Sequence, residues 1–130
     1  MMELPMRDSV ATFTEASPMA VFDVGAQLES VRLQDPAQAE KDRTVILLKT
    51  ESLRLIFRSF SEGASLPTHK APGPITVQVL DGQIEFTAGT RTTPVRKGEV
   101  LALESGVPHS VKALSDSAIL ITVAVRPESS

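Results

Sequence analysis

The sequence contains no cysteine, and this absence removes several kinds of functional site at once. Disulfides, thiolate nucleophiles and Cys-ligated zinc or iron–sulfur centres are all excluded. The chain also has no Trp, no Tyr and only five Phe. Aromatic stacking platforms for bases or sugars are therefore not its main binding device, and we expect a small, mostly aliphatic core.

Positive charge is scarce and scattered. Thirteen Lys and Arg stand against sixteen Asp and Glu, which gives a formal net charge of −3, and only Arg96–Lys97 places two basic residues together. Because phosphate binding needs clustered Lys and Arg, the sequence predicts no nucleic-acid partner.

Long apolar runs are also missing. None approaches the roughly 20 residues that a membrane helix needs. The first 25 residues carry acids and prolines where a signal peptide would have an apolar centre. We therefore expect a cytoplasmic protein with no membrane partner.

The length of 130 residues predicts one folded domain with an arm in front of it. Residues 1–42 are expected to form the N-terminal arm and lead-in segment, either extended or containing a short helix. The segment Val21–Leu33 is ambiguous because Gly25 weakens the helical pattern there. Three apolar residues of this segment have helical spacing: Val24, Leu28 and Val31.

Residues 43–126 have the texture of a β domain. Two runs rich in β-branched and large apolar residues, Thr44–Lys49 and Leu53–Phe60, flank a short polar connection and predict a hairpin. Turns then recur every 6–10 residues, which is typical of an antiparallel sandwich or barrel. Further strands are expected at Ile75–Leu80, Gln83–Ala88, Arg91–Arg96, Glu99–Leu103, His109–Leu114 and Ala118–Val125.

Two features of this pattern carry further expectations. Asp81–Gly82 lies between two strand runs and predicts a hairpin turn. Strand edges in such folds are closed or covered, often by a second subunit, so we expect a homodimer.

The chemistry of the chain centres on its two histidines. His69 lies in the stretch Glu62–Glu85, where Gly63-x5-His69-x-Ala71-x3-Ile75-x6-Gly82 resembles the first cupin motif, Gly-x5-His-x-His-x3or4-Glu-x6-Gly. His109 lies in Gly98-x5-Glu104-x-Gly106-x2-His109-x3-Ala113, which resembles the second motif, Gly-x5-Pro-x-Gly-x2-His-x3-Asn.

The resemblance covers about Arg43 to Val125 and implies an all-β fold, the cupin jelly-roll barrel or double-stranded β-helix, usually dimeric. In metal-dependent cupins two His and a Glu of the first motif and one His of the second hold a divalent transition metal. Only the first and last of these ligands are present, as His69 and His109. Ala71 stands at the second His and Ile75 at the Glu, neither of which can coordinate a metal.

Two interpretations of the histidines follow. By the family geometry both line the mouth of the barrel, where they can bind a polar group or act as acid and base near neutral pH. A structural role, with each imidazole tied to backbone in the barrel wall, is the alternative. We predict a ligand-binding pocket lined by His69, His109, Ala71, Ile75 and Val77.

A metal site would need a third donor. Glu104, close in sequence to the His109 loop, is the best candidate, ahead of Glu85 and Glu62. Gln78 is three residues beyond Ile75, so strand alternation puts it on the opposite face. If a divalent transition metal is bound, we expect His69, His109 and Glu104 to hold it.

Two cations near the motifs, Arg58 and Lys70, are candidate ligands for an anion or, alternatively, solvated surface charges. The turn Ala71–Pro74 (APGP) is expected to form a rigid lip.

Three functions remain open. The chain is a cupin that binds a small organic molecule without the full metal set, a metal-dependent dioxygenase, isomerase or lyase, or a structural or regulatory dimer. The shared fold does not choose among them.

Overall fold

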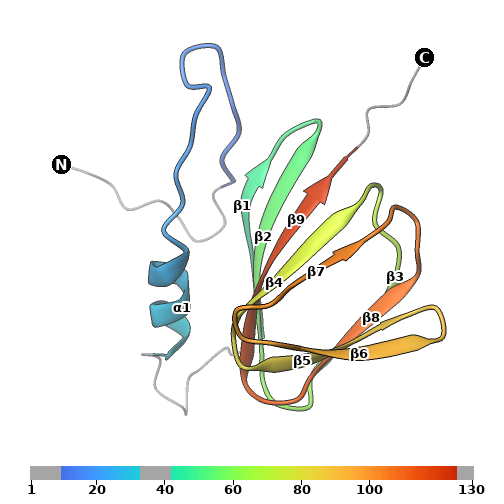
Figure 1. The fold of residues 1–130 in the computed structure, drawn as a ribbon. Coiled ribbons are helices and arrows are strands. Elements are labelled where there is room, and N and C mark those ends of the chain that lie inside the picture. Colours follow the sequence, from blue (N-terminus) through green and yellow to red (C-terminus); the bar gives the residue numbers. More distant parts are fainter. Residues whose placement is uncertain (1–9, 33–41, 126–130) are drawn as a thin grey trace.

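The computed structural model describes residues 10–32 and 42–125. These residues form two facing β-sheets, with a helix against the outer side of one of them (Figure 1). In chain order the elements are α1 (Val24–Arg32), β1 (Arg43–Lys49), β2 (Leu53–Phe60), β3 (Ser65–His69), β4 (Ile75–Asp81), β5 (Gln83–Ala88), β6 (Arg91–Arg96), β7 (Val100–Leu103), β8 (His109–Ala113) and β9 (Ser117–Ala124).

The sheets have five and four strands. The larger has the order β1-β2-β9-β4-β7 and the smaller the order β3-β8-β5-β6. Successive strands alternate between the sheets from β2 to β5 and again from β6 to β9. This alternation rolls the chain into a two-sheet barrel, so the predicted all-β class is confirmed.

Two of the predicted turns join neighbouring strands of one sheet. β1 and β2 pair antiparallel from Arg43↔Ser59 to Lys49↔Arg54, as the polar connection between them predicts. β5 and β6 likewise pair from Gln83↔Arg96 onward.

The hairpin predicted at Asp81–Gly82 is wrong. β4 pairs with β7 and β9, whereas β5 pairs with β6 and β8, so this turn carries the chain from one sheet to the other. Gly82 has a φ of +77°, and a Cβ there would collide with the backbone of Asp116 and Ser117. A tight turn is therefore needed here, but its role is to change sheets, which a local turn signal cannot reveal.

The barrel core lies between the two sheets. β4 alternates buried and exposed residues, with Ile75, Val77 and Val79 facing inward and Thr76 and Gln78 outward. The buried inner cluster consists of Phe60, Ile75, Val77, Val79, Ile84, Phe86, Val95, Val111, Ala113, Ile119 and Val123.

A second apolar cluster lies on the outer face of the larger sheet, under α1 (Figure 1). The helix begins after Asp23, whose Oδ1 accepts a hydrogen bond from the Ala26 N–H at 2.9 Å and so caps the first turn. Its helically spaced residues Val24, Leu28 and Val31 pack against a core that includes Phe57. This cover accounts for the apolar residues Leu55 and Phe57 on the outer face of β2.

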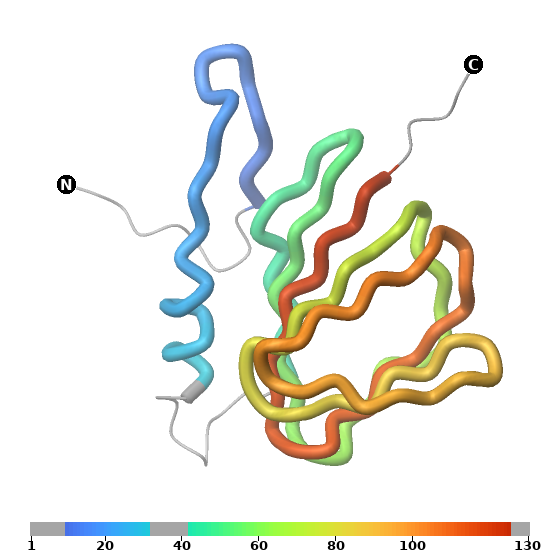
Figure 2. The backbone as a smooth tube through the Cα atoms, in the orientation of Figure 1, coloured from blue at the N-terminus to red at the C-terminus, as the bar shows by residue number. Residues whose placement is uncertain are grey.

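The segment before α1 lies along the outer edge of β1. The backbone of Ala11 donates to the Leu47 carbonyl at 3.2 Å and accepts from the Lys49 N–H at 3.0 Å, which makes a short parallel bridge. Figure 2 shows the segment continuing as a long loop before it turns down into α1. No helix among the described residues is long and apolar enough to cross a membrane.

The predicted lip, Ala71–Pro74, joins β3 to β4 and closes against the end of β9. The Ala124 N–H donates to the Pro74 carbonyl at 3.0 Å. Gly73 is buried, and a Cβ at this position would overlap the Ala124 carbonyl, which is rigid backbone. The absence of a side chain at Gly73 therefore allows the lip to lie on β9.

We expect Gly73→Ala to lower the free energy of unfolding by about 1–3 kcal/mol, because the clash must push the lip away from β9. The matched control is Gly89→Ala in the β5–β6 turn, where nothing lies within 4 Å of the added Cβ and only the φ of +61° is unfavourable. Its cost should be about 1 kcal/mol. Urea denaturation measures both, and a larger loss for Gly89→Ala would contradict the close approach at Gly73.

The homodimer stays a prediction. Large apolar side chains are exposed in the segment before α1, at Val10 (44%), Phe13 (42%), Met19 (78%) and Val21 (91%). We expect native mass spectrometry to give twice the chain mass for the full chain and one chain mass after deletion of residues 1–19. The control is Val100→Ser on β7, which removes a 59% exposed apolar residue and should keep the dimer. A dimer that survives the deletion would show that this segment is not the contact.

Candidate ligand-binding site

The two histidines meet at the end of the smaller sheet. β3 and β8 pair antiparallel, and His69 and His109 are direct cross-strand partners in that pairing. Their ring centroids are 4.3 Å apart and the rings are tilted by 60°. The structure thus brings together the two residues that the motifs single out, although they are 40 positions apart in the sequence.

Each imidazole contacts a backbone carbonyl two residues earlier in the chain. His69 Nδ1 lies 3.0 Å from the Pro67 carbonyl oxygen, and His109 Nδ1 lies 2.9 Å from the Val107 carbonyl oxygen. A carbonyl oxygen can only accept, so both Nδ1 atoms carry the hydrogen. In the neutral form each Nε2 then keeps a free lone pair. The contacts to backbone that a structural role would need are therefore present. They leave the second nitrogen of each ring available.

The two rings differ in their environment. His109 is buried, with 4% of its surface exposed, and it stacks on Phe86 with ring centroids 5.5 Å apart and an interplanar angle of 11°. His69 is exposed at the end of β3. The pair therefore spans the boundary between the barrel interior and the solvent, which suits it to contact a molecule that enters from outside.

Both histidines line a cavity of about 200 Å³ inside the barrel. This is smaller than the roughly 300–1,000 Å³ of pockets that hold drug-sized molecules, so the space suits a small ligand. Four polar residues line it: Arg54, His69, Lys70 and His109. The apolar lining consists of Ile56, Leu66, Ala71, Pro72, Ile75, Val77, Phe86, Val111, Ile119, Ile121 and Val123.

All five residues predicted to line a pocket lie on this cavity. Besides the histidines, these are Ala71 from the lip and Ile75 and Val77 from β4. Their role in binding stays a prediction.

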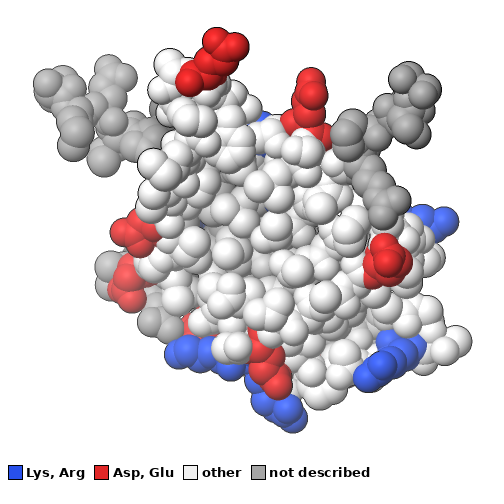
Figure 3. All heavy atoms as spheres, turned by 45° about the horizontal axis from the view of Figure 1, so that its top comes forward, with Lys and Arg blue, Asp and Glu red and all other residues white. Residues whose placement is uncertain are grey.

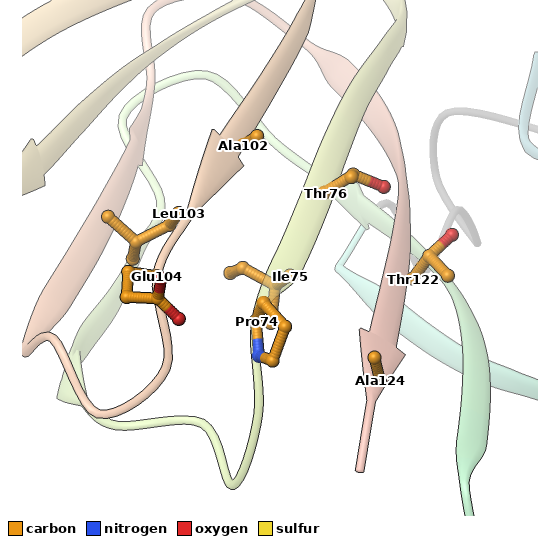
Figure 4. Close-up of a pocket in the computed structure, with 8 residues that line it drawn as sticks. All are labelled: Pro74, Ile75, Thr76, Ala102, Leu103, Glu104, Thr122 and Ala124. Atoms are coloured by element: carbon orange, nitrogen blue, oxygen red, sulfur yellow. The ribbon is translucent and has the colours of Figure 1, made fainter. Parts of the chain in front are cut away.

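The structure does not bring Glu104 to the histidines. Glu104 follows β7 and lines a groove of about 370 Å³ together with Pro74, Thr76 and Thr122, on the outer side of the larger sheet (Figure 4). One of its carboxylate oxygens accepts the N–H of Ser105 at 2.9 Å. This groove is larger than the cavity, but neither histidine lines it.

The remaining metal candidates also lie elsewhere. Glu62 and Glu85 are not among the residues that line the cavity, and Gln78 is exposed on the outer face of β4, as alternation predicts. Within residues 10–32 and 42–125 no three His, Asp or Glu side chains gather as a metal site would require. Open catalytic metal sites generally keep three protein ligands, so the residues described do not fit a tightly bound metal.

Sequence reasoning missed one polar residue of the cavity, Arg54. The period of two along β2 places Arg54 and Arg58 on the same face, and the sequence drew attention to Arg58 instead. Arg58 does not line the cavity, whereas Lys70, the other predicted cation, does. The strand alternation that places Arg54 on the same face as Arg58 was the signal that could have found it. That alternation cannot tell which of the two arginines lies at the barrel mouth.

A comparison of the sequence with models of protein families covers both motifs in one match. The model of the cupin domain matches residues 57–125, which is more than half of the chain. The chain belongs to the cupin domain family. The resemblance in its two motifs is thereby confirmed, and so is the double-stranded β-helix.

Solved structures support the same assignment. A cupin 2 conserved barrel domain protein from Leptotrichia buccalis is 32% identical, with a TM-score of 0.66, over 75% of this chain and 45% of that one. A conserved protein of unknown function from Streptococcus pyogenes is 27% identical, with a TM-score of 0.63, over 69% and 80% of the two chains. A cupin superfamily protein from Desulfitobacterium hafniense shares the fold at 14% identity and a TM-score of 0.67, over 91% and 99%. A search of curated proteins found no match.

The motif register can be tested by restoring the two missing ligands of this cupin. Ala71 and Ile75 both line the cavity with the histidines, so Ala71→His combined with Ile75→Glu would give four donors around one space. We expect the double variant to retain about one equivalent of Zn²⁺ or Co²⁺ after dialysis, measured by elemental analysis.

The matched control is Thr76→His with Gln78→Glu, which adds the same donors to the exposed face of β4. It should retain no more metal than the wild type. Equal retention by both variants, or none by a double variant whose circular dichroism is native, would contradict the alignment of the motifs.

Proposed function

We propose that this cupin binds a small organic molecule in its barrel cavity and does so without the metal of the family's four-ligand site. The proposal rests on the pair of imidazoles. Their ring centroids lie 4.3 Å apart at a cavity whose remaining wall is largely hydrocarbon. Small-molecule sites typically combine an apolar lining with a few well-placed polar groups, which is the composition found here.

The imidazoles supply the directional contacts of this site. Because each Nδ1 is occupied by a backbone carbonyl, each Nε2 is the atom available to a ligand. A neutral imidazole accepts a hydrogen bond from a ligand O–H or N–H, and a protonated one donates. The same atoms can also exchange a proton with a ligand, so a bound substrate with a labile proton would find two acid–base groups in contact.

The replacements at the family's other ligand positions support binding of an organic group. Ala71 leaves free the space that an imidazole would fill, and Ile75, with 5% of its surface exposed, presents hydrocarbon where a carboxylate would stand. Burying apolar ligand surface against such walls contributes about 25 cal/mol for each Å² removed from water.

The test combines a ligand screen with elemental analysis of the purified full chain. We expect a thermal shift with members of a panel of small acids, amides, alcohols and sugars, and less than stoichiometric transition metal. One equivalent of metal that disappears in His109→Ala would overturn the proposal and favour the metal-dependent enzyme instead.

Variants of the two histidines should separate binding from folding. His69 is exposed, so His69→Ala should change the free energy of unfolding by no more than about 0.5 kcal/mol while weakening a screen hit at least tenfold. His109→Ala should weaken binding and also destabilise by about 2 kcal/mol, because it removes a buried ring stacked on Phe86 and a hydrogen bond.

Thr68→Ala, which changes the exposed neighbour of His69, is the matched control and should leave both quantities unchanged. Isothermal titration calorimetry and urea denaturation measure them. If a folded His69→Ala protein bound the ligand with unchanged affinity, the imidazole pair would not be part of the binding site.

A further inference from the structure

The polar part of the cavity lining has only one kind of chemistry. Arg54, Lys70 and the two imidazoles supply nitrogen atoms, and no Asp or Glu is among the described residues that line the space. This contrasts with a chain whose formal net charge is −3. On the face that Figure 3 shows, acidic and basic side chains lie mainly near the margin, around an uncharged area.

Strand register places Arg54 at one end of the cavity. Arg54 on β2 pairs with Val123 on β9, and Val123 pairs with Ile75 on β4, so these three residues form one row across the larger sheet. The row lies at the end where the lip closes, since Ile75 directly follows it. Arg54 therefore stands on the same rim as Lys70.

The guanidinium of Arg54 is short of acceptors. Its Nε is buried and has no hydrogen-bond partner among the described residues. Arginine carries five N–H donors and no acceptor, so only an oxygen or another acceptor from elsewhere can satisfy it. No described Asp or Glu on the cavity wall offsets the charge of Arg54, so an anion in the cavity would be attracted to the guanidinium.

Arg58, four residues further along β2 on the same face, provides the contrast. Its Nη1 donates to Thr44 Oγ1 at 2.6 Å, and its guanidinium carbon lies 4.9 Å from the centre of the Phe60 ring. Its Nε is also buried without a partner, but the head group is engaged by the protein and lies off the cavity. Of the two arginines, only Arg54 can face a ligand.

Beyond this rim the cavity becomes apolar. The next inward row of the larger sheet is Ile56, Ile121 and Val77, which pair with one another across β2, β9 and β4. Phe86, stacked on His109, lies on the opposite sheet. A ligand that satisfies both regions is charged at one end and hydrocarbon at the other.

We propose that the cavity selects a small organic monoanion, a carboxylate with a compact apolar body, with Arg54 as the anion-binding residue and Lys70 as a second cation. The planar guanidinium fork matches the two oxygens of a carboxylate, which a spherical ammonium does not. This inference rests on the proposed function, since it names the class of molecule that the same cavity binds.

The test compares molecules of one shape that differ in charge. Isovalerate and benzoate are titrated into ¹⁵N-labelled full-length protein beside isovaleramide and benzamide, followed by NMR chemical shifts. We expect each carboxylate to bind at least tenfold more tightly than its amide. Acetate should bind more weakly than isovalerate, by about fourfold for each carbon removed from the apolar end.

Variants then locate the charge. Arg54→Met, which keeps the length of the side chain, should weaken carboxylate binding at least tenfold and amide binding by much less. Arg58→Met is the matched control and should leave both unchanged. Lys70→Met should weaken carboxylate binding more than Lys112→Met, because Lys112 is exposed on β8 and does not line the cavity. If Arg54→Met fails to fold, Arg54→Lys should fold and still weaken carboxylate binding.

The outcomes separate this inference from the proposed function. Equal binding of carboxylates and amides, abolished by His69→Ala, overturns the anion preference and leaves the cavity as a ligand site. If both Arg54 variants still prefer carboxylates to the same degree, another residue binds the anion and the role of Arg54 is overturned. Binding of no probe, of either charge, overturns the anion inference and counts against the proposed function as well.

Discussion

The pairing of β3 with β8 is the interaction on which the site depends. It makes His69 and His109 cross-strand partners, and partners on one face of a sheet have Cβ atoms about 4.5–5.5 Å apart. A slip of one residue would send one ring to the other face of the sheet. The contact from each Nδ1 to a carbonyl two residues earlier then restrains the ring, so the free Nε2 atoms are positioned before any ligand arrives.

The rest of the cavity follows from what surrounds this pair. In metal-dependent cupins a metal ion would draw the ligands together and satisfy them, whereas here hydrocarbon stands at Ala71 and Ile75. The imidazoles are thus polar groups in a largely apolar wall. Arg54 and Lys70 also line it, and no Asp or Glu of the described part of the chain does. A cavity of this composition is complementary to a molecule that carries both hydrocarbon and negative charge.

The supporting structure keeps that wall in place from two sides. The inner core packs the two sheets against each other, and the outer core packs α1 on the larger sheet, so β2 is fixed on both faces. The lip is fixed separately, because Gly73 lets it touch the backbone of β9. Arg54 on β2 and Ala71 on the lip therefore occupy positions set by rigid parts of the chain, which favours a preformed pocket over one made on binding.

The sequence by itself determined the strand-rich class, the approximate bounds of most strands and the cupin motifs, because period-two patterns, turn residues and motif spacing are all local signals. The five residues predicted for the pocket followed from the resemblance to cupins, and they line the cavity. It also contained the helical spacing of Val24, Leu28 and Val31, although Gly25 left that segment ambiguous. Only the tertiary structure decided that Asp81–Gly82 changes sheets, that Glu104 lies in an outer groove away from the histidines, and that Arg54 rather than Arg58 lines the cavity. These outcomes depend on which strands become neighbours and on which end of a strand reaches the barrel mouth, and such long-range pairings are not encoded in any short stretch of the chain.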